Sequence, residues 1–296
     1  MQFFEPNIHM LSRTTDDYEN LAVAGVIGVV EPAFWQGQPR TQIGTFIDYF
    51  DSLVGWERFR ASQFGIRHYC TMGLNPKEAN NLSLAKEVMK LLPDYLAKEG
   101  VVAVGEIGYD DINDLEERFF AEQLELAKAF ALPVLVHTPH REKIEGTRRT
   151  LDLIKEVGVN PETVVVDHLN EVTIELVTDT GCWRGHSVYP KTKMSEGRMV
   201  DLLKKYGTDK VMVNSAADWG VSDPLKVPKV GTAMLEAGFS GDEVEKVLFN
   251  NPINFFAQSG RISIDEVTRP LIDQSQLYQD NSALRGQTPL IEKGSL

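Results

Sequence analysis

The chain has 296 residues, of which 42% are hydrophobic and 25% are charged, and its formal net charge is −13. This is ordinary globular composition with ample material for a core. A negative charge of this size repels polyanions, so it argues against generic binding of duplex nucleic acid, although a local cationic or metal-filled cleft could still accept one phosphate group.

Other features of the composition concern the cellular compartment. The N-terminus has no basic segment followed by an apolar one, so no signal peptide is expected. No stretch approaches the roughly 20 apolar residues that cross a bilayer. Cys70 and Cys182 both lie in apolar runs and are expected to be buried thiols rather than a disulfide. These features predict a cytoplasmic protein with no membrane partner.

Short apolar segments alternate with longer amphipathic ones from the first residues onward, which is the pattern of alternating strands and helices. The expected strands are Gln2–Ile8, Gly25–Val30, Gly65–Met72, Val101–Glu106, Leu132–Val136, Thr163–Val166, Cys182–Val188 and Lys210–Asn214. The expected helices are Thr14–Ala24, about Thr41–Ser62, Lys77–Glu99 with a break at Pro93, Asp114–Ala131, Lys143–Val157, Glu171–Thr178, Glu196–Tyr206, Leu225–Ala237 and Asp242–Ala257.

Eight such units at roughly 30-residue intervals predict a parallel sheet with right-handed crossovers. Because no glycine-rich dinucleotide fingerprint follows the first strand, a closed (β/α)8 TIM barrel in the α/β class is favoured over an open sheet. Residues 1–258 are predicted to form this barrel domain. Residues 259–296 are polar and lack periodicity, so they are expected to form a C-terminal extension that is wrapped on the surface or partly disordered.

Metal-binding residue types recur where the predicted strands end. Catalytic groups gather at the C-terminal ends of barrel strands, and imidazole and carboxylate groups suit divalent ions such as Zn²⁺ and Mn²⁺. A single histidine at a strand end is more often a hydrogen-bonding loop residue, but the recurrence in successive units favours a site for one or two metal ions. The residues concerned are His9, Glu106, His137, His168 and Asp218.

A second set of residues is expected on the same rim, where it could contact substrate. His140, Arg141, His186, Lys191 and Lys193 are candidates for binding a polar or anionic group, with a solvated loop as the alternative for the lysines. Phe34 and Trp35 could form a wall of the pocket or simply cover the barrel mouth, and Tyr109 could orient Glu106. His68 lies inside a strand and is expected to be a core histidine.

Several of these segments resemble the TatD-type metal-dependent hydrolases, a family of amidohydrolase-like barrels. The similarity extends over about residues 1–257 and rests on Asn7-Ile8-His9, Gly105-Glu106-Ile107-Gly108, Pro133-Val134-Leu135-Val136-His137, Val166-Asp167-His168 and the Asp218 segment. The resemblance implies a distorted barrel with one or two divalent ions (Zn, Mn or Mg).

The resemblance also implies roles for the individual residues. Glu106 would bridge the two ions, His137 and His168 would complete one site, and His9 and Asp218 would serve the other. Asp218 would also act as the catalytic residue by accepting the proton of the attacking water. The implied activities are those of nucleases, phosphoesterases and related hydrolases.

The chain departs from the family pattern at three places. Asn7 stands where the family has the first histidine of His-x-His, and a neutral amide oxygen is a poorer Zn²⁺ ligand than imidazole. Asn75 precedes Pro76 where the family usually has a histidine, and Ala216 stands two residues before Asp218 where an acidic residue is usual. The metal site is therefore a stronger prediction than the substrate class.

Three hypotheses follow. The first is a metal-dependent hydrolase that cleaves a phosphoester or a small ester, amide or lactone bond of a small-molecule substrate. The second is a catalytically weakened barrel that binds metal or a metabolite and acts as a partner in a biosynthetic pathway, which Asn7 and Asn75 suggest. The third is a structural barrel without metal. A homo-oligomer, with the tail from Ser259 covering a neighbouring subunit, remains open.

Overall fold

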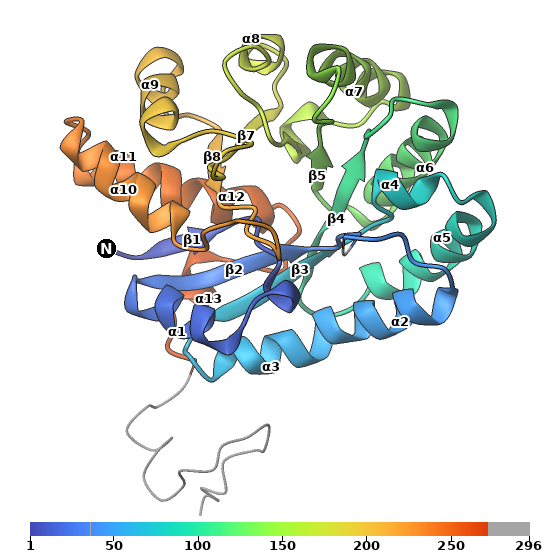
Figure 1. Cartoon of the computed structure of the whole chain (residues 1–296), viewed down its shortest axis with the longest axis horizontal. Coiled ribbons are helices and arrows are strands. Elements are labelled where there is room, and N and C mark those ends of the chain that lie inside the picture. The colour runs from blue at the N-terminus through green and yellow to red at the C-terminus, as the bar shows by residue number, and fades with distance from the viewer. Residues whose placement is uncertain (36, 272–296) are drawn as a thin grey trace, which may run out of the picture.

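A computed structural model of the chain describes residues 1–35 and 37–271. Eight parallel strands form one sheet in which each strand pairs with the next along the chain, and helices lie outside it (Figure 1). The strands are β1 (Phe3–Glu5), β2 (Val26–Pro32), β3 (Arg67–Met72), β4 (Val101–Gly108), β5 (Val134–His137), β6 (Val164–Val166), β7 (Trp183–Ser187) and β8 (Val211–Asn214). The predicted (β/α)8 barrel is confirmed.

The barrel closes between β1 and β8 through the segments that follow these strands. Ala216 N donates to the Asn7 carbonyl at 2.9 Å, and His9 N donates to the Ala217 carbonyl at 2.8 Å. The Glu5 carboxyl group also accepts from Ser215 N at 3.1 Å. The sheet is therefore a nearly closed cylinder, in which backbone hydrogen bonds between loops join β1 to β8. These loops lie at the mouth of the cavity.

Helices connect the strands and surround the cylinder. They are η1 (Met10–Ser12), α1 (Thr15–Val23), α2 (Ile43–Asp51), η2 (Ser52–Trp56), α3 (Glu57–Ser62), α4 (Pro76–Ala79), α5 (Leu82–Leu96), α6 (Asp114–Phe130), α7 (Lys143–Val157), η3 (Pro161–Thr163), α8 (Ile174–Val177), α9 (Glu196–Tyr206), α10 (Lys226–Glu236), α11 (Gly241–Glu245), η4 (Lys246–Asn250), α12 (Asn251–Ala257) and α13 (Ile264–Thr268). The helix expected over about 41–62 is interrupted by the π-helical turn η2, whereas α5 continues through Pro93.

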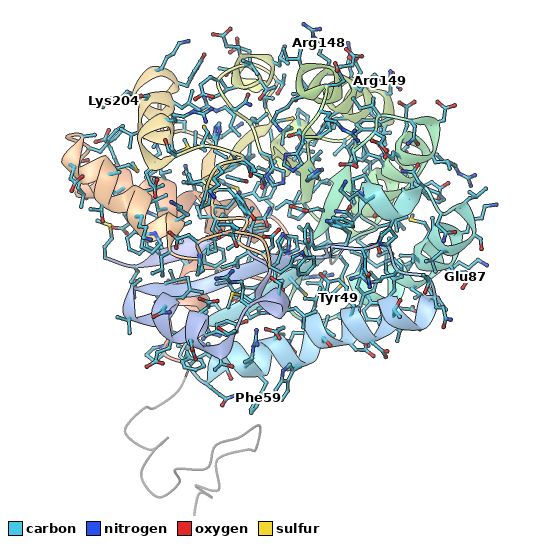
Figure 2. The ribbon with its side chains drawn as sticks, in the orientation of Figure 1. Tyr49, Phe59, Glu87, Arg148, Arg149 and Lys204 are labelled. Atoms are coloured by element: carbon cyan, nitrogen blue, oxygen red, sulfur yellow. The ribbon has the colours of Figure 1, made fainter. Side chains whose placement is uncertain are left out.

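The outer helices have one polar and one apolar face. Figure 2 shows Glu87, Arg148 and Lys204 projecting from the outside of the molecule, whereas Tyr49 turns from α2 toward the sheet. Cys70 and Cys182 are buried free thiols, as expected from the sequence. Among the described residues, no helix combines the length and hydropathy that a membrane crossing requires.

The interior of the cylinder is apolar at the end where the strands begin. Inward-facing residues such as Phe4, Val30 and Leu135 join side chains of α12 and the segment after it in one buried cluster. Ile262 and Val267 belong to this cluster, so residues 259–271 of the predicted extension pack against the barrel. Residues 272–296 lie outside the described residues.

Candidate metal centre

The cavity at the C-terminal ends of the strands has a volume of about 290 Å³. Its wall is built from residues at or just beyond several strand ends, as the barrel topology requires. The lining residues are His9, Phe34, Trp35, Asn75, Lys77, Glu106, His137, His140, His168, Tyr189, Thr192, Lys193, Ala216 and Asp218.

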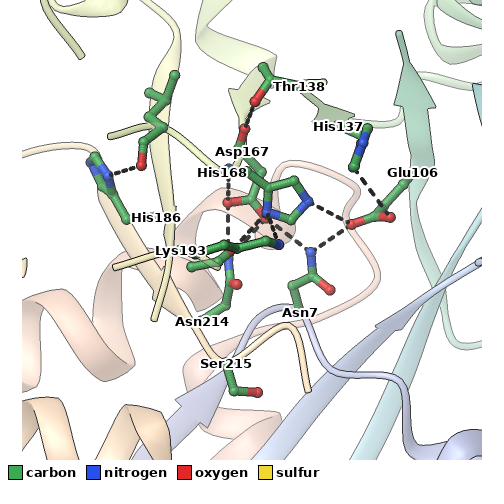
Figure 3. Close-up of polar contacts among 12 residues, drawn as sticks. Asn7, Glu106, His137, Thr138, Asp167, His168, His186, Lys193, Asn214 and Ser215 are labelled. Carbon is green, nitrogen blue, oxygen red and sulfur yellow. Dashed lines mark hydrogen bonds and ion pairs between the residues drawn. The ribbon is translucent and has the colours of Figure 1, made fainter. Parts of the chain in front are cut away.

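Three side chains meet at one point of this cavity (Figure 3). Glu106 comes from β4, His137 from the end of β5, and His168 follows β6 by two residues. One candidate ligand atom from each lies within 4.8 Å of the other two. His168 Nε2 is 3.5 Å from Glu106 Oε1, and His137 Nδ1 is 4.0 Å from Glu106 Oε2. Glu106 and His168 are 62 positions apart in the sequence, yet they converge with His137 on one small volume.

The chemistry of these atoms fits a divalent ion. Glu106 Oε2 and His137 Nδ1 are both buried and have no hydrogen-bond partner in the described structure, which is costly unless a further group binds them. Burial lowers the pKa of His137 and of His168 well below the usual range, so both imidazoles are neutral, the form that ligates metal. One carboxylate and two neutral imidazoles are a common donor set for Zn²⁺ and related ions.

The second nitrogen of His168 fixes the orientation of its ring. His168 Nδ1 lies 2.6 Å from Ser187 Oγ at the end of β7 and 3.1 Å from Lys193 Nζ. The backbone of His168 lies in the left-handed region, with φ of 61°, which a non-glycine residue rarely adopts. The Asp167 carboxylate accepts the His168 N–H at 2.6 Å and supports this conformation.

The Asp167 carboxylate, next to His168 in the chain, accepts hydrogen bonds from two side-chain amides. Asn214 Nδ2 donates to its Oδ2 at 2.9 Å, and Asn7 Nδ2 donates at 2.9 Å both to Asp167 Oδ2 and to Glu106 Oε1. Because carboxylates only accept, an amide nitrogen must face them. A Cβ added at Gly185 would lie 2.6 Å from Asp167 Oδ1, so this position requires glycine. Asn7 therefore lies beside the cluster as a hydrogen-bond donor.

The other two predicted ligands line the cavity but lie outside the compact group of three. The His9 ring stacks on Phe34 with 4.0 Å between centroids, and its buried Nδ1 has no partner among the described residues. Asp218 Oδ1 accepts from Tyr189 Oη at 2.9 Å and from Gly220 N at 2.8 Å. The metal-binding roles of His9 and Asp218 stay predictions.

The residues predicted to contact substrate divide into two groups. Phe34, Trp35, His140 and Lys193 line the cavity, whereas His186, Tyr109, Arg141 and Lys191 do not. His186 faces away from the cavity in β7 because the neighbouring Ser187 faces His168, and its Nδ1 bonds the Leu169 carbonyl.

Tyr109 and Arg141 each bind an acidic residue that does not line the cavity. The Tyr109 hydroxyl donates to Glu117 on α6 at 2.9 Å, and the exposed Arg141 pairs with Asp111 at 2.8 Å. The arrangement therefore gives no support to a substrate contact by Tyr109, Arg141 or His186.

Sequence patterns do not single out two polar residues at this end of the barrel, Glu5 and the half-buried Lys143. Glu5 is fully buried, and burial raises its pKa to about 8. Lys143 reaches from the start of α7 and donates to Thr138 Oγ1 at 2.9 Å. A charged residue within an apolar strand is a usable sequence signal for Glu5, whereas Lys143 has none beyond its position six residues after His137.

A larger cavity of about 580 Å³ lies at the opposite end of the barrel. Its lining includes Leu151, Val159, Pro161 and Cys182, which belong to the end of α7 and to loops that precede β6 and β7. Its lining lacks the converging carboxylate and imidazole groups of the first cavity, so the first cavity is the candidate site.

Comparison with known proteins agrees with this architecture. Residues 40–257 match the family model described as TatD related DNase. An uncharacterized metal-dependent hydrolase of Methanocaldococcus jannaschii is 26% identical over 253 residues, which cover 85% of this chain and 98% of that protein.

Two solved structures share the fold. The TatD-like protein of Archaeoglobus fulgidus has a TM-score of 0.70 and 24% identity, with 86% of this chain and 99% of that chain covered. The phosphotriesterase homology protein of Escherichia coli, solved with phosphate in its active site, has a TM-score of 0.64 and 17% identity over 86% of this chain and 98% of that chain. The family match covers most of the barrel, and the resemblance drawn from the sequence is confirmed: the chain belongs to the TatD-related DNase family, and its matched relative is named a metal-dependent hydrolase.

Proposed function

We propose that the protein is a hydrolase that uses one divalent ion, held by Glu106, His137 and His168, to cleave an ester bond in a small molecule. The observation that carries this proposal is the pair of buried, unpartnered atoms, Glu106 Oε2 and His137 Nδ1, at the point where the three side chains meet. A buried carboxylate oxygen without a donor is destabilising, and a cation that completes its coordination removes this cost.

A divalent ion bound there would lower the pKa of a coordinated water and polarise the oxygen of the scissile bond. In this proposal, Asp218, which lines the same cavity, accepts the proton of the attacking water. Tyr189 and Gly220 hold its Oδ1, which orients the carboxylate and leaves Oδ2 for the proton. Phe34 stacks on His9 and lies 5.3 Å from Trp219 between ring centroids, so aromatic rings shield this part of the cavity from water.

The position of Asn7 supports one ion rather than two. Its amide nitrogen donates to Glu106 Oε1 and to Asp167 Oδ2, where it compensates two carboxylates without a cation. A second ion near His9 and Asp218 would have to displace this amide from Glu106. Elemental analysis of the purified protein is expected to give one ion per chain, and Asn7→His is expected to raise that value toward two.

The volume of the cavity and the net charge of the whole chain support a small substrate. A volume of about 290 Å³ lies at the lower limit for small-molecule sites, and a net charge of −13 disfavours a long polyanion. The Escherichia coli structure with phosphate in its active site shares the fold, which makes a phosphoester the first substrate class to test and a lactone or simple ester the second.

Hydrolysis should be measured with p-nitrophenyl phosphate, a bis-phosphodiester, single-stranded DNA and a lactone panel, each with Mn²⁺, Zn²⁺ and Mg²⁺. We expect metal-dependent cleavage of one of the small substrates and abolition of that activity in His137→Ala. Metal-loaded protein that hydrolyses none of the compounds would contradict the proposal. Hydrolysis that appears only in Asn7→His would instead favour a catalytically weakened barrel.

A further inference from the structure

A second, smaller cavity adjoins the metal centre. It has a volume of about 140 Å³ and shares four lining residues with the first cavity, namely His140, His168, Thr192 and Lys193. The remaining lining residues are Lys143, Leu169, Asn170, Ser187, Met194 and Arg198. The two cavities are therefore neighbours.

The lining of this second cavity is basic, although the protein as a whole is acidic. Among the described residues that line it there is no Asp or Glu, whereas Lys143, Lys193 and Arg198 are all present. Arg198 already has a bidentate partner in Glu171, at 2.6 Å for both contacts, and its third nitrogen holds the Lys193 carbonyl at 3.0 Å. Arg198 therefore fixes the loop that carries Lys193.

The two lysines lack such a partner. Lys143 Nζ donates to Thr138 Oγ1 at 2.9 Å and to the Pro139 carbonyl at 3.2 Å, and Lys193 Nζ lies 3.1 Å from His168 Nδ1. Neither ammonium forms an ion pair within the part of the chain that the structure describes. Asp167 attracts both lysines from a greater distance, and Glu106 and Asp218 attract Lys193.

Partial burial of two neighbouring ammonium groups is unfavourable. Desolvation, and after it the charge of Lys193, lowers the pKa of Lys143 to about 8. Ammonium groups that lack a paired carboxylate are stabilised by an anion that bridges them. Nothing acidic in the lining competes for that position, and Asn170 Oδ1 is turned away because it accepts the Val172 N–H at 3.1 Å.

We propose that this second cavity is an oxyanion subsite, in which Lys143 and Lys193 bind a phosphate or carboxylate group that the substrate carries apart from its scissile ester. This inference deepens the proposed function and rests on it for the position of the scissile bond. It narrows the substrate class to small esters with a second, anionic group, because a neutral ester would leave both ammonium groups unpaired.

The subsite is tested by phosphate binding to the full chain in the presence of a metal chelator, so that no ion can bind the phosphate. Inorganic phosphate is the probe, and calorimetry measures its Kd for the parent and for Lys143→Met and Lys193→Met. Each loss of a charged donor is expected to weaken phosphate binding by about tenfold. Lys204→Met is the matched control, because Lys204 is an exposed lysine of α9 outside both cavities (Figure 2).

Lys143→Arg keeps the positive charge and is expected to bind phosphate within a few-fold of the parent, which separates loss of charge from loss of fold. Absence of phosphate binding in the parent protein, or equal binding in the parent and both methionine variants, would overturn the proposal. Thermal melting of each variant checks that the barrel is intact.

A second measurement identifies the anion. Aryl esters with the same leaving group and a distal phosphate, a distal carboxylate or no charge are compared by their KM. We expect a lower KM for one of the charged esters, and an increase in that KM in Lys143→Met with no change for the neutral ester. If no ester is hydrolysed, the proposed function fails while the phosphate titration still decides the subsite.

Discussion

The two ends of the barrel differ in the kinds of side chain that they bury. At the end where the strands begin, which we call the closed end, an apolar cluster joins the inward-facing strand residues to Phe249, Phe255, Ile262 and Val267. At the end where the strands finish, which we call the open end, Glu106 and His137 carry buried polar atoms without partners. The same strands supply both ends: β4 begins with buried valines and finishes at Glu106 and the residues beside it.

This contrast separates stability from chemistry along the barrel axis. Apolar packing at the closed end is expected to determine the free energy of unfolding. The unsatisfied polar atoms at the open end reduce stability. In the proposed function, a bound ion and a substrate would provide their missing partners. Variants at the two ends should therefore change different measured quantities.

His168→Ala should have the largest effect of the single changes at the open end. It removes one of three converging ligand groups, and a bound divalent ion contributes several kcal/mol to transition-state stabilisation. We expect kcat/KM to fall by about a thousandfold or more, with metal content reduced. Elemental analysis and initial rates measure both, and a variant that keeps its metal and its rate would remove His168 from the centre.

Phe255→Ala is the corresponding change at the closed end. Phe255 is fully buried and packs at 5.1 Å from Phe256 and 5.4 Å from Trp183 between ring centroids. Its truncation should lower the free energy of unfolding by about 3–5 kcal/mol. Urea unfolding gives this value, and metal content at low urea should equal that of the parent. A loss of metal without a loss of stability would contradict the separation of the two ends.

A smaller effect on the free energy of unfolding is expected from the ionisation of Glu31, which lies between the sheet and the outer helices. Its buried carboxyl group bonds His68 Nε2 at 2.8 Å, and burial raises its pKa to about 8, whereas burial lowers the pKa of His68. The folded state therefore keeps a proton on Glu31 that the unfolded state releases at lower pH. Stability should fall as the pH rises toward 8, by at most about 1.4 kcal/mol per pH unit from this group.

Glu31→Gln removes this contribution while keeping a polar side chain of the same size. The slope of unfolding free energy against pH between 6.5 and 8 should become less steep, although Glu5, whose pKa is also raised to about 8, retains its own share. Urea midpoints at several pH values measure the slope. An unchanged slope would show that Glu31 is already ionised in the folded state.

The sequence predicts the fold well because alternation and strand ends are local properties. The eight strands lie within a few residues of their expected bounds, and Glu106, His137 and His168 converge because parallel strands place their ends on one face. The direction in which an individual side chain points is harder to predict from the sequence. Placement of His186 required knowing which of two neighbouring residues in β7 faces the cavity, and the amide bridge from Asn7 to Glu106 and Asp167 joins residues up to 160 positions apart.

We propose that Glu106, His137 and His168 share one divalent ion. Anomalous X-ray scattering at the metal absorption edge, measured from a crystal grown with Mn²⁺ or Zn²⁺ in excess, locates such an ion. We expect a single strong peak bounded by the Glu106 carboxylate and the two imidazole rings. A peak elsewhere in the barrel, or no peak between these three side chains, would show that they do not share an ion.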